Sequence, residues 1–86
     1  MPEISRFFGI IVRMYFDDHE PPHFHTCYAG TQGVVGIDPI CILHGDLPHR
    51  AASMVIEWAA LHQRELVDNW ERLHTGRPPQ KVAPLP

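Results

Sequence analysis

Apolar side chains alternate with other residues in the first part of the chain. Between residues 5 and 16 every even position from 8 onward is apolar, namely Phe8, Ile10, Val12, Met14 and Phe16. Arg13 and Tyr15 occupy odd positions of the same stretch. A period of two is typical of a strand with one buried face. The pattern therefore predicts a strand over residues 5–16 with its even face in the core.

Short apolar runs separated by turn residues follow this stretch. Gly and Asp-Pro signals near residues 30–33 and 38–39 mark turns. The runs around them predict three further strands, at residues 23–29, 33–38 and 40–44. The links are too short for parallel crossovers, so we expect an antiparallel meander of three to four strands.

A helical period replaces the strand period after Pro48, because proline is favoured in the first turn of a helix. The apolar positions then recur at helical spacing, at Met54, Val55, Trp58, Leu61, Leu66, Trp70 and Leu73. Gly76 and the prolines after it stop the helix. The pattern predicts one long or bent helix over residues 48–75, packed on the sheet, and so an α+β fold. Residues 1–76 form the predicted domain, and residues 77–86 an extended tail.

The length of this helix raises a question of fit. It would run roughly 40 Å at about 1.5 Å per residue, whereas a compact chain of this size is about 30 Å across. We expect the helix to bend near His62 or to overhang the sheet. An overhang would expose Trp70 to a partner, while Trp58 is expected in the core.

Composition places the chain among ordinary globular proteins. It has 86 residues, of which 44% are hydrophobic and 20% charged. No apolar run is long enough to span a bilayer, and no signal peptide is evident, so we expect a cytoplasmic protein without membrane contact. The two cysteines, Cys27 and Cys41, lack the close spacing of a zinc site and are expected to be reduced.

Acidic residues dominate the first half of the chain. Residues 1–47 contain two basic and six acidic side chains, a charge of −4, within a total of −3. A phosphate backbone needs clustered Lys and Arg. The charge therefore disfavours RNA or the ribosome as a ligand and suits a metal cation better.

Residues 19–25 have the sequence HEPPHFH and form the strongest candidate site. Pro21 and Pro22 fix their own backbone angles and restrict the residues before them. A stiff loop loses less entropy when its side chains must hold one geometry. Together with His19, these prolines are predicted to line a binding groove.

Strand alternation separates the histidines from the core. His23 and His25 share one face of the predicted strand, whereas Phe24 and Tyr28 share the other. Imidazoles this close can bind zinc, copper, nickel or iron. With His19 folded back, His19, His23 and His25 are candidate ligands of a divalent transition metal such as zinc. The alternative is that His25 is a structural residue and His19 a turn residue.

Metal-free chemistry is a second interpretation of the same groove. His23 or His25 could act as general acid or base near neutral pH. Arg13, at an odd position of the first strand, could stabilise developing negative charge, and Tyr28 completes the candidate catalytic set. The alternative for Arg13 is a surface salt bridge with Asp17 or Glu20.

The predicted helix carries polar residues that could join the loop. His62, Glu65 and Asn69 share one helical face. His62, Asn69 and Trp70 are therefore added to the candidate binding residues. The alternative is a solvated face on which Glu65 pairs locally.

The whole chain resembles a prokaryotic family described as domain of unknown function 4160. The similarity is carried by PEISRFFGIIVRMYFDDHEPPHFHTCY near the start and by HGDLPHRAASMVIEWAALHQRELVDNWERLHTG later on. Family members commonly have an acidic residue at the position of Cys27, which argues against Cys27 as an essential ligand. Members are often encoded beside another small protein, in an arrangement that resembles toxin–antitoxin pairs.

Three functions follow as expectations. The first is a partner-binding component of a two-gene, toxin–antitoxin-like cassette, with a small cognate protein encoded nearby or a second copy as partner. The second is a small metal-independent ribonuclease that uses His23 and His25. The third is a transition-metal-binding protein.

Overall fold

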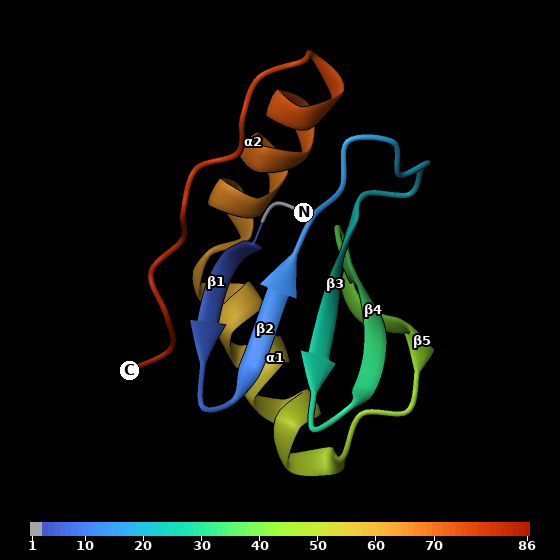
Figure 1. Cartoon of the computed structure of the whole chain (residues 1–86), viewed down its shortest axis with the longest axis vertical. Coiled ribbons are helices and arrows are strands. Elements are labelled where there is room, and N and C mark those ends of the chain that lie inside the picture. Colours follow the sequence, from blue (N-terminus) through green and yellow to red (C-terminus); the bar gives the residue numbers. More distant parts are fainter. Residues whose placement is uncertain (1–2) are drawn as a thin grey trace.

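The computed structural model describes residues 3–86, which form a five-stranded sheet followed by two helices (Figure 1). The strands are β1 (Glu3–Phe7), β2 (Ile10–Arg13), β3 (His23–Tyr28), β4 (Thr31–Ile37) and β5 (Ile40–Gly45). The helices are α1 (His49–Leu61) and α2 (Gln63–His74). Neighbouring strands in the chain are neighbours in the sheet, and every pair is antiparallel. The predicted α+β class and antiparallel meander are confirmed.

The predicted single strand over residues 5–16 is wrong, because the chain reverses direction at Phe8 and Gly9. Both residues have positive φ angles, 49° and 81°. A two-residue turn of this kind matches the twist of a hairpin, and Phe7 pairs directly with Ile10 across it. The turn is not evident from the sequence, because Phe8 continues the alternation of apolar residues. In the structure Phe8 is 60% exposed.

The predicted single helix over residues 48–75 is two helices that meet at His62. The His62 N–H still donates to the carbonyl oxygens of Trp58 and Ala59, at 3.1 and 3.2 Å. Next to it, the Gln63 side-chain amide donates to the Ile37 carbonyl oxygen at 2.7 Å and ties the break to the sheet. The bend near His62 therefore lets both helices follow the sheet.

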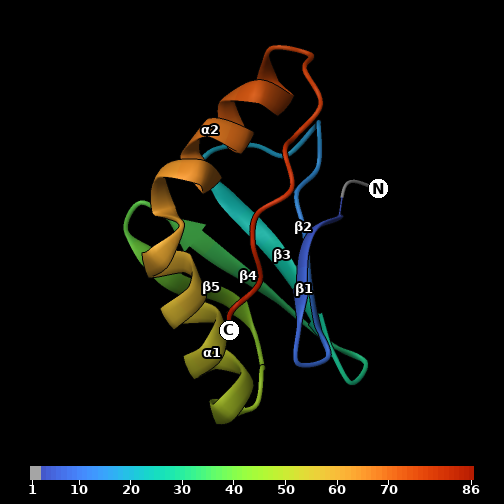
Figure 2. The ribbon, with the colours of Figure 1, turned by 90° about the vertical axis from the view of Figure 1, so that its left-hand side faces the viewer.

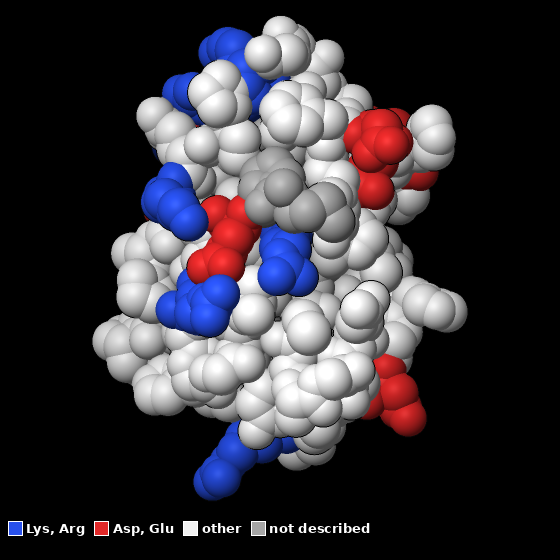
Figure 3. Space-filling model, in the orientation of Figure 1, with Lys and Arg blue, Asp and Glu red and all other residues white. Residues whose placement is uncertain are grey.

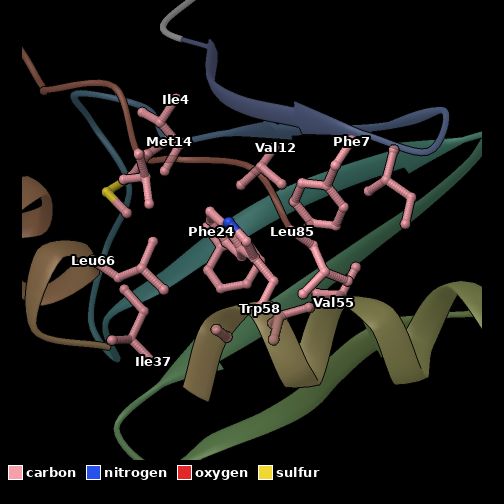
Figure 4. Close-up of a cluster of buried hydrophobic side chains, with 14 of the residues drawn as sticks. Ile4, Phe7, Val12, Met14, Phe24, Ile37, Val55, Trp58, Leu66 and Leu85 are labelled. Carbon is pink, nitrogen blue, oxygen red and sulfur yellow. The ribbon is translucent and has the colours of Figure 1, made fainter. Parts of the chain in front are cut away.

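Both helices cover the same face of the sheet, and the core lies between the two layers (Figure 2). Trp58 is fully buried at its centre, with ring centroids 5.3 Å from Phe7 and 5.6 Å from Phe24. Side chains from strands and helices surround this group, as Figure 4 shows for Val12, Met14, Ile37, Val55 and Leu66. The other face of the sheet carries the odd positions of β2 and β3, Arg13 and His25 among them.

Residues 77–86 run past α2 and then beside β1 (Figure 1). The Val82 N–H donates to the Ile4 carbonyl oxygen at 2.8 Å, and Trp58 Nε1 donates to the Ala83 carbonyl oxygen at 2.8 Å. Val82 and Leu85 are buried. This C-terminal arm thus covers the outer edge of β1 and completes the core.

Helices long and apolar enough to cross a membrane do not occur among residues 3–86.

Candidate functional site

Asp18, His23 and His25 converge where the loop after β2 meets the start of β3. Asp18 Oδ2 lies 2.9 Å from His25 Nε2 and 3.3 Å from His23 Nε2. One ligand atom from each of the three residues lies within 4.8 Å of the others. His23 and His25 are alternate residues of one strand, so their side chains share a face. The loop folds back and brings Asp18 onto that face.

The tautomer of His23 is set by its contact with Pro21. His23 Nδ1 lies 2.7 Å from the Pro21 carbonyl oxygen, which can only accept a hydrogen bond. Nδ1 therefore carries a hydrogen, and a neutral ring has its lone pair on Nε2, facing the Asp18 carboxylate. Two electron-rich atoms 3.3 Å apart repel each other unless a cation, either a proton or a metal ion, lies between them.

Two aromatic rings, of Tyr15 and Trp70, pack against the histidines of the cluster. The Tyr15 ring meets the His25 ring edge-on at 4.6 Å, and the Trp70 ring lies 5.2 Å from the His23 ring. Trp70 is only 5% exposed, and its Nε1 donates to Glu20 at 3.3 Å. The alternative of an overhanging helix that exposes Trp70 to a partner is therefore wrong: α2 lies against the histidine loop, and this contact buries the indole within the chain.

His74 fastens the Asp18 loop to the end of α2. Its Nδ1 lies 2.8 Å from the Trp70 carbonyl oxygen, and its Nε2 lies 2.8 Å from the Asp18 carbonyl oxygen. Both partners accept only, so both contacts are hydrogen bonds when the imidazole is protonated. The hydrogen bond to Trp70, followed by the one to Asp18, raises the pKa of His74.

Arg13 lies directly opposite His25 in the β2–β3 register. The two side chains line a small cavity on the outer face of the sheet, together with Tyr15, Cys27 and Gln32 among others. The expected salt bridge from Arg13 to Asp17 or Glu20 is not among the ion pairs of residues 3–86. Arg13 instead lies beside the cluster, opposite His25.

Several other predicted site residues lie away from the cluster. His19 is exposed, and Asp18 takes the position that His19 was expected to fill. Tyr28 packs against the core, on the opposite face of β3. Asn69 exchanges two hydrogen bonds with the backbone of Gln80, at 2.8 and 2.7 Å.

His62 also serves a local purpose. Its Nδ1 lies 2.9 Å from Glu65 Oε1, and its ring contacts Trp58. The two prolines contribute through their backbone: the Pro21 carbonyl oxygen accepts from His23, and the Pro22 carbonyl oxygen accepts from the Ile37 N–H at 3.1 Å. Pro22 thereby anchors the loop to β4.

Sequence reasoning missed Asp18, Tyr15 and His74. Tyr15 could have been predicted, because it lies at an odd position two residues after Arg13 and should therefore point to the same side. Asp18 and His74 carried none, because their contact joins residues 56 positions apart.

A family model described as Domain of unknown function (DUF4160) matches residues 9–71. The matched span contains all three residues of the cluster, together with Arg13, Tyr15 and Trp70. It excludes β1, His74 and the C-terminal arm. No curated protein and no solved structure matched the chain.

Proposed function

The chain belongs to the family described as Domain of unknown function (DUF4160), as its sequence indicated, and we propose that it binds a divalent transition-metal ion through Asp18, His23 and His25. The observation that carries this proposal is that Nε2 of His23 and Nε2 of His25 both face Asp18 Oδ2, at 3.3 and 2.9 Å. A metal ion between them would turn a repulsive contact into two coordinate bonds.

The spacing of Asp18 from the two imidazoles supports an ion. Ligand atoms about 2.1 Å from one ion lie roughly 3.0–3.4 Å apart at octahedral to tetrahedral angles. The contacts of Asp18 with His25 and His23, 2.9 and 3.3 Å, are close to these values. The hydrogen bond from His23 Nδ1 to Pro21 is the outer contact that metal-binding histidines usually make.

The donor set indicates the kind of ion and the kind of site. Two imidazoles and one carboxylate suit zinc, iron, copper or nickel. Three protein ligands leave coordination positions open, as in catalytic rather than structural zinc sites. An ion held in this way can polarise a bound substrate or lower the pKa of a bound water.

Metal titration of protein purified without a histidine tag tests the proposal. We expect one zinc ion per wild-type chain, lost in Asp18→Asn and retained in His19→Ala, which alters the exposed neighbour only. Substoichiometric zinc in the wild type, or equal uptake by Asp18→Asn, would overturn it.

A second candidate is the metal-independent ribonuclease. Its support is the 2.9 Å contact that orients His25 toward Asp18, with Arg13 opposite, an arrangement suited to general acid–base catalysis at a phosphate. Its test is RNA cleavage after exhaustive chelation. Activity that survives chelation and disappears in His25→Ala would favour this candidate over the metal site.

A third candidate is the partner-binding component of a two-gene, toxin–antitoxin-like cassette. Its support is β5, which lies at the edge of the sheet and contains no Asp, Glu, Lys or Arg. Two apolar residues of this strand, Ile42 and Leu43, are 40% and 45% exposed. Such edges readily pair with another strand. Co-expression with the protein encoded nearby should give a stable complex, and separate elution of the two would count against it.

A further inference from the structure

A guanidinium group that forms no ion pair with a carboxylate of residues 3–86 lies beside the proposed metal ligands. Arg13 on β2 and His25 on β3 are direct cross-strand partners, and the Cβ atoms of such partners are about 4.5–5.5 Å apart. Both side chains line the small cavity on the outer face of the sheet. The Arg13 guanidinium could therefore contact a ligand of a metal ion held by His25.

The carboxylate opposite Arg13 on β1 is already engaged by another arginine. Glu3 lies opposite Arg13 in the β1–β2 register, yet its two oxygens accept from Arg6 at 3.1 and 2.8 Å. Arg72 has its own partner in Asp68. Arg13 is half-buried, and a partly desolvated cation is unfavourable without an anion. The Arg13 guanidinium is thus suited to bind an anionic ligand.

We propose that the Asp18–His23–His25 site takes a small phosphate monoester, whose phosphoryl oxygens bind the metal ion and Arg13; this inference rests on the proposed metal site. A divalent ion, the Asp18 carboxylate and the Arg13 guanidinium sum to two positive charges when the histidines are neutral. A phosphate monoester carries about −1.5 to −2 at neutral pH. A carboxylate ligand would leave one charge unmatched. The planar fork of arginine also fits two phosphate oxygens.

The surrounding surface favours a small ligand over a nucleic acid. On the face shown in Figure 3, basic groups are separated from one another by acidic and uncharged surface. The chain has a net charge of −3, and Asp17 and Glu20 belong to the same loop as Asp18. A long polyanion would need a continuous basic track to neutralise successive phosphates. A single phosphoryl group needs only the ion and Arg13.

Cobalt(II) provides a probe that reports metal and phosphate separately, because its visible absorption depends on its ligands. The experiment loads the full chain with cobalt(II) and titrates it first with inorganic phosphate and then, in a parallel sample, with acetate. We expect phosphate to change the cobalt spectrum and to bind more tightly than acetate. Arg13→Gln should weaken phosphate binding about 10- to 100-fold, as expected for lost hydrogen bonds between charged groups, with unchanged cobalt affinity.

Two further variants complete the test. Arg72→Gln removes a cation of α2 and should leave phosphate binding within about twofold of the wild type, because that charge is already paired with Asp68. Arg13→Lys keeps the charge and should restore part of the affinity, which also guards against a folding defect in Arg13→Gln. If the chain takes up cobalt but does not bind phosphate, this inference alone is overturned. The same holds if Arg13→Gln binds phosphate as tightly as the wild type. Failure to take up cobalt would overturn the metal site and the inference together.

Discussion

His23 Nδ1 and the Pro21 carbonyl oxygen are 2.7 Å apart, and this contact fixes which ring nitrogen of His23 faces Asp18. The acceptor belongs to a backbone stiffened by two successive prolines, so it holds its position without help from a flexible side chain. The loop supplies both a ligand and the group that orients a ligand. Outer contacts of this kind raise the basicity of a bound imidazole and keep its ring in place.

Replacement of Asp18 by asparagine should weaken zinc binding by more than the roughly 10- to 100-fold that loss of an outer contact causes. The amide keeps the size of the side chain but removes its charge, the only negative charge among the three donors. Competition with a chromophoric chelator measures the affinity. The matched control is His19→Ala, which should bind zinc like the wild type. Equal affinities of Asp18→Asn and the wild type would refute the assignment.

Zinc should also stabilise the folded chain. A ligand at one hundred times its dissociation constant adds about 2.7 kcal/mol to the free energy of unfolding. For a domain of this size that corresponds to a rise in Tm of about 10–20 °C. Differential scanning calorimetry with and without zinc checks the shift. The same rise in Asp18→Asn would mean that the ion binds elsewhere.

Protonation of His74 should make stability depend on pH. Its pKa is raised above the ordinary value of 6.5, chiefly by the hydrogen bond to the Trp70 carbonyl oxygen. The folded state therefore holds the proton more tightly than the unfolded state. The resulting stabilisation is complete below about pH 6.5 and is lost as the pH rises through the folded-state pKa.

Urea unfolding of the metal-free protein between about pH 6 and pH 8 tests this dependence. The loss of stability on raising the pH should be smaller in His74→Ala than in the wild type. His49→Ala, in the exposed first turn of α1, should keep the wild-type pH profile. An unchanged profile in His74→Ala would contradict the assigned role of the His74 contacts.

Asn69 should stabilise the fold by holding the C-terminal arm. Its side-chain amide donates to the Gln80 carbonyl oxygen and its side-chain oxygen accepts from the Gln80 N–H, and the residue is only 1% exposed. Asn69→Ala should lower the free energy of unfolding by about 1–3 kcal/mol. Gln80→Ala keeps the backbone atoms that Asn69 binds and should stay within about 0.5 kcal/mol of the wild type. Equal effects of the two substitutions would argue against a stabilising role of the hydrogen bonds between Asn69 and the Gln80 backbone.

The features that depend on local pattern could be predicted from the sequence. Alternation placed Val12, Met14 and Phe24 in the core and His23 and His25 on the opposite face, because neighbouring side chains of a strand must point to opposite sides. The length of the predicted helix indicated a bend near His62, because a straight helix would extend beyond the sheet. The hairpin at Phe8 was missed because the turn lies within an unbroken apolar alternation.

The features that depend on distant contacts could not be predicted. Asp18 enters the cluster because its loop is held by His74, and no spacing within the loop reveals that contact. The same holds for Trp70, whose burial depends on the loop that contains Glu20. The histidine segment was recognised as a candidate site, but its third member came from outside the motif.

The pairing of Val82 with Ile4 has a consequence for the order in which the protein is made. The strand that contains Ile4 is synthesised before the residues that cover its edge. Until then, β1 presents an open edge and Trp58 lacks the backbone acceptor at Ala83. The finished packing of this protein is therefore reached only after residues 80–85 have left the ribosome.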